Sequence, residues 1–407
     1  MRKFLIFTIV ICILLACGRN EEKRIVVWHS MRPDATEILK EQLRIFGGRH
    51  PGWKFRELFY APETARTNFI ISAIGGSGPA LFWGASDNIG PFVELEVIKP
   101  IEPYLTEAFL DSFITDPIPA NTWYKNHLYQ IADRVGNHLC LVYNKKYIQN
   151  PPKTMSKLIE MGKDLLENPD FEKLEYALAW NYTEPFFAIP FIGGFGGWIM
   201  DENYQPTLNT PATVKAAKFI YDLANVEKII PVESDYETAN ALFKDGLTAM
   251  IINGPWSWNT YLENGIDIGI ARIPKIDETG LWPTPIISPL GYSLNTNLTG
   301  EKLEIAVELL KFLTSTEVEL VFTKAMATVP SRKEALEDPI VKNNDLLRNS
   351  ITQIEVGRPM PVVTELRWIW DAMRPAYQGI FTGKYTPEQA ANMMQELAVK
   401  LIKENRQ

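Results

Sequence analysis

The sequence predicts an α/β protein built from two lobes. The chain has 407 residues, more than one hydrophobic core usually serves, and this length favours two lobes over a single small module. Short apolar runs of strand length alternate along the chain with segments whose apolar residues recur at helical spacing. Hydrophobic residues make up 46% of the chain and charged residues 22%, as in ordinary globular domains, so we expect neither a disordered chain nor a polytopic membrane protein.

Predicted strands and helices alternate through the first hundred residues. In order they are a strand at 25–28, a helix at 38–46 closed by two glycines, a strand at 53–60, a helix at 68–74 and a buried strand at 80–83. Because strands that alternate with helices form βαβ units, this order predicts α/β layers with a largely parallel sheet.

The rest of the chain continues the pattern and ends in helices. Further strands are predicted at 137–144, 177–180, 248–253 and 266–273, and further helices after residue 154, at 214–223, at 303–313, at 316–327 and from 387. Three of these helices have recognisable starts. Thr154 is a candidate N-cap, and Thr316 with Glu319 and Thr386 with Gln389 match the capping box.

The first residues resemble an export signal. Two basic residues precede an apolar stretch over 4–16, which is too short for the roughly 20 residues of a transmembrane helix. The stretch ends Leu-Leu-Ala-Cys-Gly, which resembles the lipobox of bacterial lipoproteins. This resemblance implies a signal peptide at 1–16, a diacylated Cys17 that anchors the protein to a membrane, and a tether at 17–23. The alternative is a soluble secreted protein in which Cys17 is unmodified.

The cysteine count is compatible with export without disulfides. Cys12 leaves with the predicted signal peptide and Cys17 is acylated, so Cys140 alone remains in the folded body. Its neighbours Leu139 and Leu141 are apolar, which predicts a buried and inert thiol.

Composition and motifs argue against several classes of function. The formal net charge is −8 and no dense basic run occurs, so nucleic-acid binding has little electrostatic support. No HExxH pattern occurs, and His138 and Cys140 lack a second ligand pair, so no metal site is predicted. The glycine-rich segments 75–78 and 193–197 match neither a P-loop nor a dinucleotide fingerprint, and no cofactor is predicted.

Five short blocks carry the strongest functional pattern. In chain order they are Phe82-Trp83 with Asp87; Leu141-Val142-Tyr143-Asn144 with Asn150-Pro151-Pro152-Lys153-Thr154; Glu184-Pro185-Phe186; Phe243 and Gly246 leading to Ala249-Met250 and to Ile252-Asn253-Gly254-Pro255-Trp256-Ser257-Trp258; and Trp370 with Arg374. In order and approximate spacing, from about residue 24 to the C-terminus, these blocks resemble the carbohydrate solute-binding proteins of ABC importers. The resemblance is to the maltose and maltodextrin-binding branch of that family.

The residue types in these blocks suit a sugar independently of the resemblance. A pyranose ring has apolar C–H faces and a rim of hydroxyls, so flat aromatic side chains bind its faces while carboxylates, amides and arginine bind its edge. The candidate platforms are Trp83, Phe186, Tyr236, Trp256 and Trp370, and the candidate edge groups are Asp87, Glu184 and Arg374. By resemblance these positions line a ligand cleft.

Each position also has a structural interpretation that the sequence leaves open. Large aromatic side chains more often fill a core, Asp87 suits a turn or an N-cap, and Glu184, just before a proline, suits a helix start. The Gly-Pro turn before Trp256 favours a strand end that opens onto a cleft, and the i, i+4 spacing of Trp370 and Arg374 places them on one helical face. Two further tryptophans are assigned to packing, Trp258 and Trp368.

The resemblance implies a type II periplasmic-binding-protein fold, with discontinuous lobes joined by a hinge of crossover segments. The implied lobes are an N-terminal lobe at 24–135 and 291–337 and a C-terminal lobe at 136–290 and 338–407, with crossovers at 136–138, 286–291 and 338–339. The implied function is capture of maltose, maltodextrin or a related oligosaccharide between the lobes. A monomer outside the cytoplasm then delivers the sugar to the transmembrane subunits of an ABC permease, without a catalytic step.

The chain departs from the family pattern at several positions of the expected cleft. Arg32 and Pro33 occupy the turn after the first strand, where the maltose branch carries an acidic and a basic residue. Asn88 stands where arginine is common, Asn137 replaces an acid at the first crossover but is kept as a candidate ligand contact, and Phe186 lacks the hydroxyl of the usual tyrosine. The polar subsite is therefore rebuilt, and the sequence does not select one sugar.

Two rival functions use the same residues differently. Paired carboxylates beside aromatic platforms also describe glycoside hydrolases, and Asp87, Asp133 and Glu184 offer candidate pairs for a cell-surface enzyme of that kind. A structural surface lipoprotein without a small ligand is the second rival.

Overall fold

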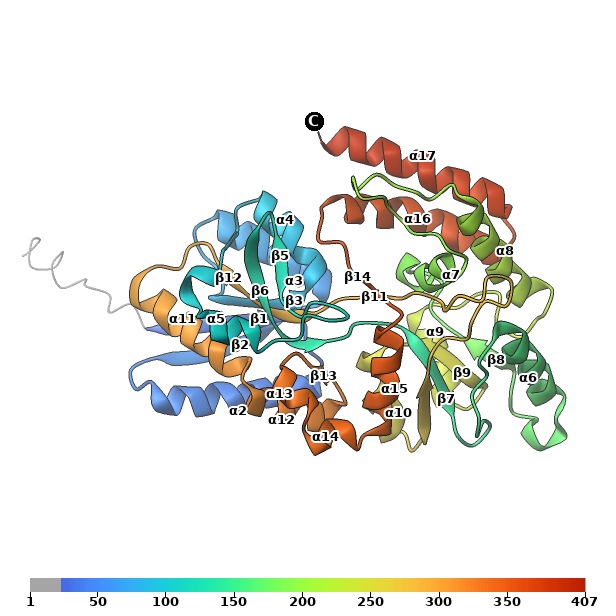
Figure 1. The fold of residues 1–407 in the computed structure, drawn as a ribbon, viewed down its shortest axis with the longest axis horizontal. Helices are drawn as coiled ribbons and strands as arrows, with labels where there is room; N and C mark the ends of the chain where they lie inside the picture. Colours follow the sequence, from blue (N-terminus) through green and yellow to red (C-terminus); the bar gives the residue numbers. More distant parts are fainter. Residues whose placement is uncertain (1–22, 407) are drawn as a thin grey trace, which may run out of the picture.

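The computed structural model describes residues 23–406, which form two α/β bodies lying side by side (Figure 1). The predicted signal peptide at 1–16, Cys17 and most of the predicted tether lie outside the described residues. Within residues 23–406, no helix combines the length and the apolar composition needed to span a bilayer.

The first body is built on a mixed sheet. Its strand order is β13 (Val329–Pro330), β6 (His127–Val135), β12 (Leu290–Asn295), β3 (Leu81–Ala85), β1 (Arg24–His29) and β2 (Lys54–Phe59), while β4 (Ile98–Lys99) pairs with β12 and β5 (Thr122–Tyr124) with β6. Strand β1 runs parallel to β2 and β3, with Val27 opposite Glu57 on one side and Leu81 on the other. Strand β12 is antiparallel to both β3 and β6.

In this first sheet, parallel pairing is limited to β1, β2 and β3, so the prediction of a largely parallel sheet is wrong. Strand β12 enters the first sheet only after the chain has built the second one, and it enters from the opposite end. It passes so close to β6 that a Cβ added at Gly291 would lie 2.1 Å from the carbonyl oxygen of Ile131, which only glycine avoids. Local alternation of strands and helices carries no information about such a late insertion.

The second body has a smaller mixed sheet, and a two-stranded ribbon lies apart from both sheets. The order is β10 (Ile268–Ala271), β7 (Cys140–Asn144), β9 (Thr248–Asn253) and β8 (Tyr176–Ala179), and the ribbon pairs β11 (Ile286–Ile287) with β14 (Arg358–Pro359). Strands β8 and β9 are parallel, whereas β7 and β10 are antiparallel to their neighbours. The strand predicted at 137–144 begins only at Cys140, and Asn137 takes a left-handed backbone with φ 47°, outside the β region.

Helices surround the two sheets (Figure 1). Those of the first body are α2 (Pro33–Arg49), α3 (Pro62–Ile74), η1 (Ser86–Asn88), α4 (Ile89–Glu94), η2 (Glu102–Tyr104), α5 (Glu107–Asp111), α11 (Gly300–Leu313), α12 (Thr316–Met326) and α13 (Lys333–Leu336), while α14 (Pro339–Lys342) leads from α13 toward the second body. Those of the second are α6 (Met155–Glu167), η3 (Pro169–Phe171), η4 (Pro185–Phe187), α7 (Ile189–Gly194), α8 (Pro211–Asn225), α9 (Tyr236–Lys244), α10 (Pro255–Glu263), α15 (Asp345–Ile354), α16 (Glu365–Phe381) and α17 (Pro387–Asn405).

The chain passes between the bodies at three places. It leaves β6 for β7 after Val135, returns through β11 into β12, and leaves β13 through α13 and α14 for α15. The first two passages lie side by side, since the backbone N–H of Ser288 donates to the carbonyl of Gly136 at 2.9 Å. Two of the three connections are thereby held in register by a backbone hydrogen bond.

Two of the three predicted helix starts are confirmed. Thr154 accepts from the backbone N–H of Lys157, and Thr386 with Gln389 forms both hydrogen bonds of a capping box. The third is wrong, because the N-cap of α12 is Ser315. Glu319 is buried instead and accepts hydrogen bonds from the next segment of chain.

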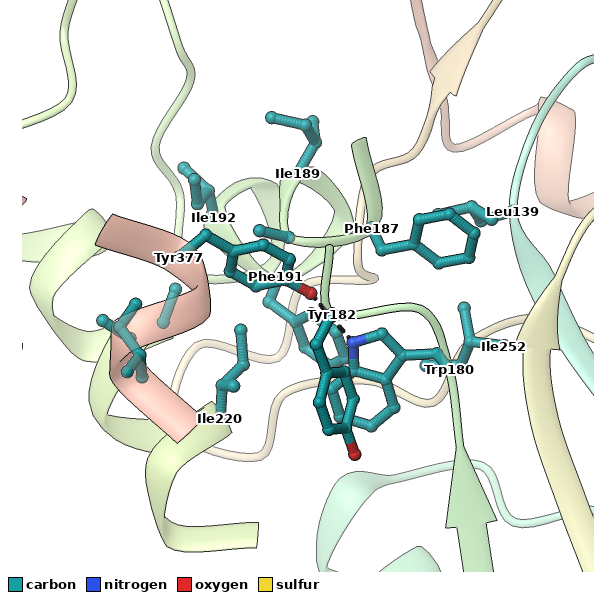
Figure 2. Close-up of a cluster of buried hydrophobic side chains, with 14 of the residues drawn as sticks. Leu139, Trp180, Tyr182, Phe187, Ile189, Phe191, Ile192, Ile220, Ile252 and Tyr377 are labelled. Atoms are coloured by element: carbon teal, nitrogen blue, oxygen red, sulfur yellow. Dashed lines mark hydrogen bonds between the residues drawn. The ribbon is translucent and has the colours of Figure 1, made fainter. Parts of the chain in front are cut away.

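The core of the second body joins residues distant in the chain (Figure 2). Trp180, just after β8, is fully buried and donates from Nε1 to the hydroxyl of Tyr377 on α16 at 2.9 Å. Trp258 is fully buried, as the sequence predicted. Cys140 is buried as well, so the prediction of a buried thiol is confirmed, and burial raises the pKa of that thiol.

Tyr377→Phe tests the buried hydrogen bond of Figure 2. The change removes the acceptor of the Trp180 indole N–H without opening a cavity, so we expect a loss of about 1–3 kcal/mol in the free energy of unfolding. Urea denaturation measures it. Tyr104→Phe, at a tyrosine that is 37% exposed, is the control and should change stability by less than about 0.5 kcal/mol. Equal effects of the two changes would contradict the assignment.

Glu319 is a buried carboxyl group that ties α12 to the end of β13. It is 1% exposed and accepts from the backbone N–H groups of Ser331 at 2.8 Å and Arg332 at 2.9 Å. Burial raises the pKa of Glu319 to about 8, although these hydrogen bonds work in the opposite direction. The folded protein therefore keeps a proton on Glu319 at a pH where the unfolded chain has already lost it.

The free energy of unfolding should consequently fall as the pH rises from about 4.5 to about 8, since the unfolded state releases the proton first. Glu319→Gln resembles the protonated form and should flatten this dependence, by an amount on the order of 2–5 kcal/mol between the two limits. Denaturation curves at several pH values measure it, with Glu317→Gln at an exposed position of the same helix as the control. An unchanged pH profile in Glu319→Gln would refute the assignment.

Candidate functional site

A cavity of about 730 Å³ lies where the two bodies meet. The first body contributes the β1–α2 turn, α3 and the segment from β3 through η1, and the second contributes η4, the start of α10 and one face of α16. Its lining includes Trp83, Asp87, Asn137, Glu184, Phe186, Trp256, Trp370 and Arg374, eight of the nine predicted ligand-binding residues. The structure therefore brings together side chains from both ends of the chain.

Tyr236 is the predicted residue that does not line this cavity. It is the first residue of α9 and is half-buried. Burial raises the pKa of Tyr236, and a hydrogen bond with Trp256 opposes this effect. Its place is therefore next to a lining residue rather than on the surface of the cavity.

Three aromatic side chains form the wall contributed by the second body. The ring centroid of Phe186 lies 6.4 Å from that of Trp256 and 6.5 Å from that of Trp370. Trp256 sits in the first turn of α10, directly after β9, as the Gly-Pro turn predicted. A Cβ at Gly254 would lie 2.0 Å from the Trp256 ring, so this position must be glycine for the indole to take its place.

Trp83 on the opposite wall is held by a buried ion pair. Its Nε1 donates to both carboxylate oxygens of Asp133 at 3.1 Å, and Arg134 donates to the same oxygens at 3.1 and 2.7 Å. The guanidinium of Arg134 also lies 5.2 Å from the centre of the Trp83 ring. With only 5% of its surface exposed, Trp83 presents a small, rigidly held part of its ring to the cavity.

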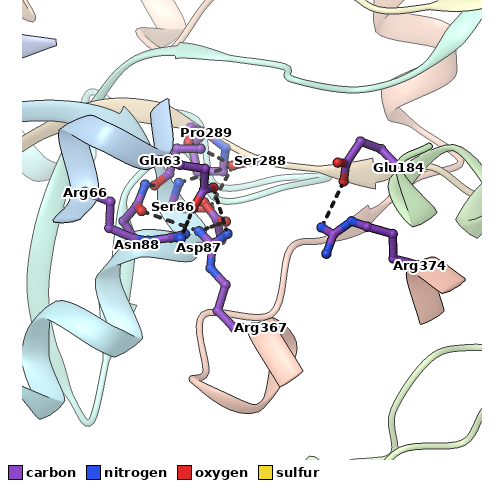
Figure 3. A network of polar contacts seen from close by, with 11 residues as sticks. Glu63, Arg66, Ser86, Asp87, Asn88, Glu184, Ser288, Pro289, Arg367 and Arg374 are labelled. Atoms are coloured by element: carbon purple, nitrogen blue, oxygen red, sulfur yellow. Dashed lines mark hydrogen bonds and ion pairs between the residues drawn. The ribbon is translucent and has the colours of Figure 1, made fainter. Parts of the chain in front are cut away.

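Helix α16 carries charged groups to both walls. Arg367, Trp370, Asp371 and Arg374 are spaced i, i+3, i+4 and i+7, so they share one helical face. In Figure 3 Arg367 points toward Asp87 of the first body and Arg374 toward Glu184 of the second. One helix thus supplies an arginine to each body.

The Glu184–Arg374 pair is the more open of the two. Arg374 donates to Glu184 at 3.3 Å and to Asp371 at 3.0 Å, and the Glu184 side chain remains 49% exposed. Burial acts to lower the pKa of Arg374, but the hydrogen bonds to Glu184 and Asp371 outweigh it and raise the pKa. Glu184 makes no capping hydrogen bond to η4, although the sequence left that role open.

The Asp87–Arg367 pair connects the bodies and was not predicted from the sequence. Arg367 also approaches Glu63 at 3.5 Å, and Glu63 pairs with Arg66 of α3 (Figure 3). Burial first, and the charge of Arg367 second, lower the pKa of Arg66 to about 10, so it stays protonated at neutral pH. Arg367 lies three residues before Trp370, and this helical spacing could have identified it as a cavity residue. No local sequence pattern distinguishes Arg66 in this way.

A second contact between the bodies comes from the turn after β1. Arg32 donates to the backbone carbonyl of Trp256, and Asn259 approaches the carboxylate of Asp34 at 3.4 Å. Asn137, at the first passage between the bodies, holds a left-handed backbone at φ 47°. Arg32 stood out in the sequence only as a departure from the family pattern.

The cavity combines apolar ring faces with ion-paired donors and acceptors. Within residues 23–406 no group of three or more His, Cys, Asp or Glu side chains is placed to hold a metal ion. Trp368 packs on the core and does not line the cavity, as predicted. The fold and the site together define a two-bodied ligand-binding protein with its site between the bodies.

Residues 42–349 match the family described as bacterial extracellular solute-binding protein, and the chain belongs to this family. A maltotriose-binding protein of Pyrococcus abyssi is 28% identical over 371 residues, covering 89% of this chain and 78% of the relative. A galactooligosaccharide-binding protein of Bacillus subtilis is 26% identical to this chain, and the alignment covers 98% of this chain and 96% of the relative.

A solved structure shows the same fold. It is the maltose/maltodextrin-binding domain MalE from Bdellovibrio bacteriovorus bound to maltotriose, with 44% identity and a TM-score of 0.85. The match covers 93% of this chain and 100% of that one. The expected type II periplasmic-binding-protein fold and the expected family are thus confirmed.

Asp133→Asn tests the support of Trp83. The amide oxygen still accepts from the indole, but the Arg134 charge loses its partner in a buried setting, so we expect a loss of about 3–5 kcal/mol in the free energy of unfolding. Adding Arg134→Met removes the unpaired charge and should recover much of the loss. Chemical denaturation compares the two, and a double variant as unstable as the sum of the single variants would contradict the prediction.

Proposed function

We propose that this protein captures maltodextrin or a closely related neutral oligosaccharide in the cavity between its two bodies and delivers it to an ABC importer. The observation that carries the proposal is the pairing, in one cavity, of three aromatic rings with two arginine–carboxylate pairs. Rings match the C–H faces of a sugar, and the ion-paired groups match its hydroxyl rim. The relatives from Pyrococcus abyssi and Bacillus subtilis are named for the oligosaccharides that they bind, which supports an oligosaccharide as the ligand of this protein.

The preference for an α-glucan comes from the solved structure with 44% identity, which holds maltotriose. The proposed ligand contacts are Trp83, Asp87, Asn137, Glu184, Phe186, Trp256, Trp370 and Arg374, with Tyr236 supporting Trp256 through a hydrogen bond. Phe186 and Trp256 offer the larger faces, since Trp83 and Trp370 are only 5% and 8% exposed. Asp87 and Glu184 supply acceptors, and Arg374 supplies donors.

We further propose that the bodies act as lobes that close on the ligand. The lobes would be 24–135 with 291–337 and 136–290 with 338–407, and the three passages of the chain between them would form the hinge. The contacts of Arg32 with Trp256 and of Arg367 with Asp87 already join the two sides, and a sugar that touches both sides favours the closed form by its differential affinity. The permease would then recognise that form.

The family is extracellular, and we propose that this member is a monomer held at a membrane by a lipid on Cys17. The support is the Leu-Leu-Ala-Cys-Gly stretch after the apolar segment, since two acyl chains give lasting attachment. Metabolic labelling with a fatty acid, lost in Cys17→Ser, would test this part of the proposal.

The rival glycoside hydrolase is disfavoured by the engagement of its candidate carboxylates. Asp87, Asp133 and Glu184 are each bound by an arginine, whereas hydrolysis needs one carboxyl group free to give a proton to the glycosidic oxygen. We propose that no catalytic step occurs. Glucose released from maltotriose during long incubation, above a protein-free control, would contradict this.

Trp256→Ala tests the binding proposal directly. Loss of a ring face should weaken maltotriose binding by about 10- to 100-fold, while the melting temperature without sugar changes little, because the side chain is only partly buried. Isothermal titration calorimetry and a thermal melt measure the two effects.

Trp123→Ala is the matched control, since this tryptophan is 47% exposed on β5 and outside the cavity. Unchanged affinity of Trp256→Ala with a large fall in melting temperature would identify Trp256 as a core residue. A wild-type protein that binds none of maltose, maltotriose and maltotetraose would refute the function itself.

A further inference from the structure

Unpartnered buried donors gather at one end of the cavity. Among the described residues, Arg66 Nη1, Thr364 Oγ1 and Arg367 Nε are buried side-chain atoms without a hydrogen-bond partner, and all three residues line the cavity. An unmet buried polar group costs about 1–3 kcal/mol. Three of them around one cavity wall therefore form a costly arrangement unless an acceptor enters from the cavity.

These donors come from both bodies. Arg66 lies on α3 of the first body, whereas Thr364 precedes α16 and Arg367 lies in its first turn. The side chains of Arg66 and Arg367 are 20% and 23% exposed, so each is mostly buried although both residues line the cavity. None of the three belongs to the sequence blocks that predicted the cleft.

The charges around these donors are balanced. Arg367 pairs with Asp87 and approaches Asn88 at 3.4 Å, and Arg66 pairs with Glu63 (Figure 3). Asp371 of α16 is paired with Arg374. Arg66 and Arg367 thus each meet one carboxylate, which leaves no excess of positive charge for an anion. The surplus is in hydrogen-bond donors, and it matches a neutral ligand rich in oxygen acceptors.

We propose that Arg66, Thr364 and Arg367 form a donor subsite that hydrogen-bonds the hydroxyl and acetal oxygens of one glycosyl unit of a neutral oligosaccharide. This inference rests on the proposed function and adds to it three specificity-determining residues. The subsite lies across the cavity from the Glu184–Arg374 pair, at the other end of the α16 face (Figure 3). Since its members come from both bodies, it is complete only when α3 and α16 approach each other.

Thr364→Val is the sharpest test. Valine keeps the shape of threonine and removes a hydroxyl that has no partner, so the melting temperature of the sugar-free protein should stay the same or rise. Affinity for maltotriose should fall about fivefold or more, because one donor to the ligand is lost. Stabilisation without loss of affinity would assign the hydroxyl no part in binding and would overturn the subsite.

Arg66→Gln extends the test to charge-assisted donation. We expect maltotriose affinity to fall at least about tenfold by calorimetry. Arg44→Gln is the matched control, because Arg44 pairs with Glu41 on the exposed side of α2, outside the cavity. Equal affinities of the two variants would overturn the subsite, and so would a loss that only parallels a fall in the sugar-free melting temperature.

A charged sugar tests whether the ligand of this subsite is neutral or anionic. Maltobionate carries a carboxylate on an otherwise similar disaccharide, and the balanced charges predict that it binds no better than maltose. Tighter binding of maltobionate would overturn the assignment to a neutral sugar. If the wild type binds none of the maltodextrins, the proposed function falls together with the subsite; if it binds them and the variants match the control, the subsite alone falls.

Discussion

Helix α16 couples the two bodies through the arginine–carboxylate pairs on one of its faces. Arg367 reaches Asp87 across the cavity, Arg374 reaches Glu184 on its own side, and Trp370 lies between them as an aromatic wall. Two turns after Trp370 on the same helix, Tyr377 accepts from Trp180 in the core. The geometry of the site therefore depends on how firmly α16 packs on the second body.

The arginine–carboxylate pairs also explain why the site is polar but does not favour anions in general. Partly buried ion pairs hold each carboxylate and each guanidinium in one place, which fixes donors and acceptors before a ligand arrives. A buried donor or acceptor in the cavity that lacks a partner is costly because it is removed from water. The site therefore favours a sugar whose hydroxyls pair with these groups over a ligand that leaves them unpaired. The aromatic rings add contact area with the C–H faces of a sugar, and this contact does not depend on one arrangement of hydroxyls.

Local sequence signals succeeded where the physics is local. The capping box at Thr386, the Gly-Pro turn before Trp256 and the apolar setting of Cys140 each involve residues close in the chain, and the structure confirms them. The predicted capping box of Thr316 with Glu319 is wrong, because Ser315 caps the helix and the buried Glu319 accepts from the backbone N–H of Ser331. The predicted helix end at glycines 47 and 48 is also wrong, because α2 continues through them to Arg49.

The sequence by itself determined the α/β class, the family and most of the aromatic residues of the cavity, because these follow from periodicity and from short blocks of neighbouring residues. Only the tertiary structure decided the mixed strand directions and the pairing of Arg367 with Asp87, 280 residues apart in the chain. It also decided that Trp83 is nearly covered and that Arg66 faces the cavity. Such contacts depend on the three passages of the chain between the bodies, and no local propensity encodes which distant side chains those passages bring together.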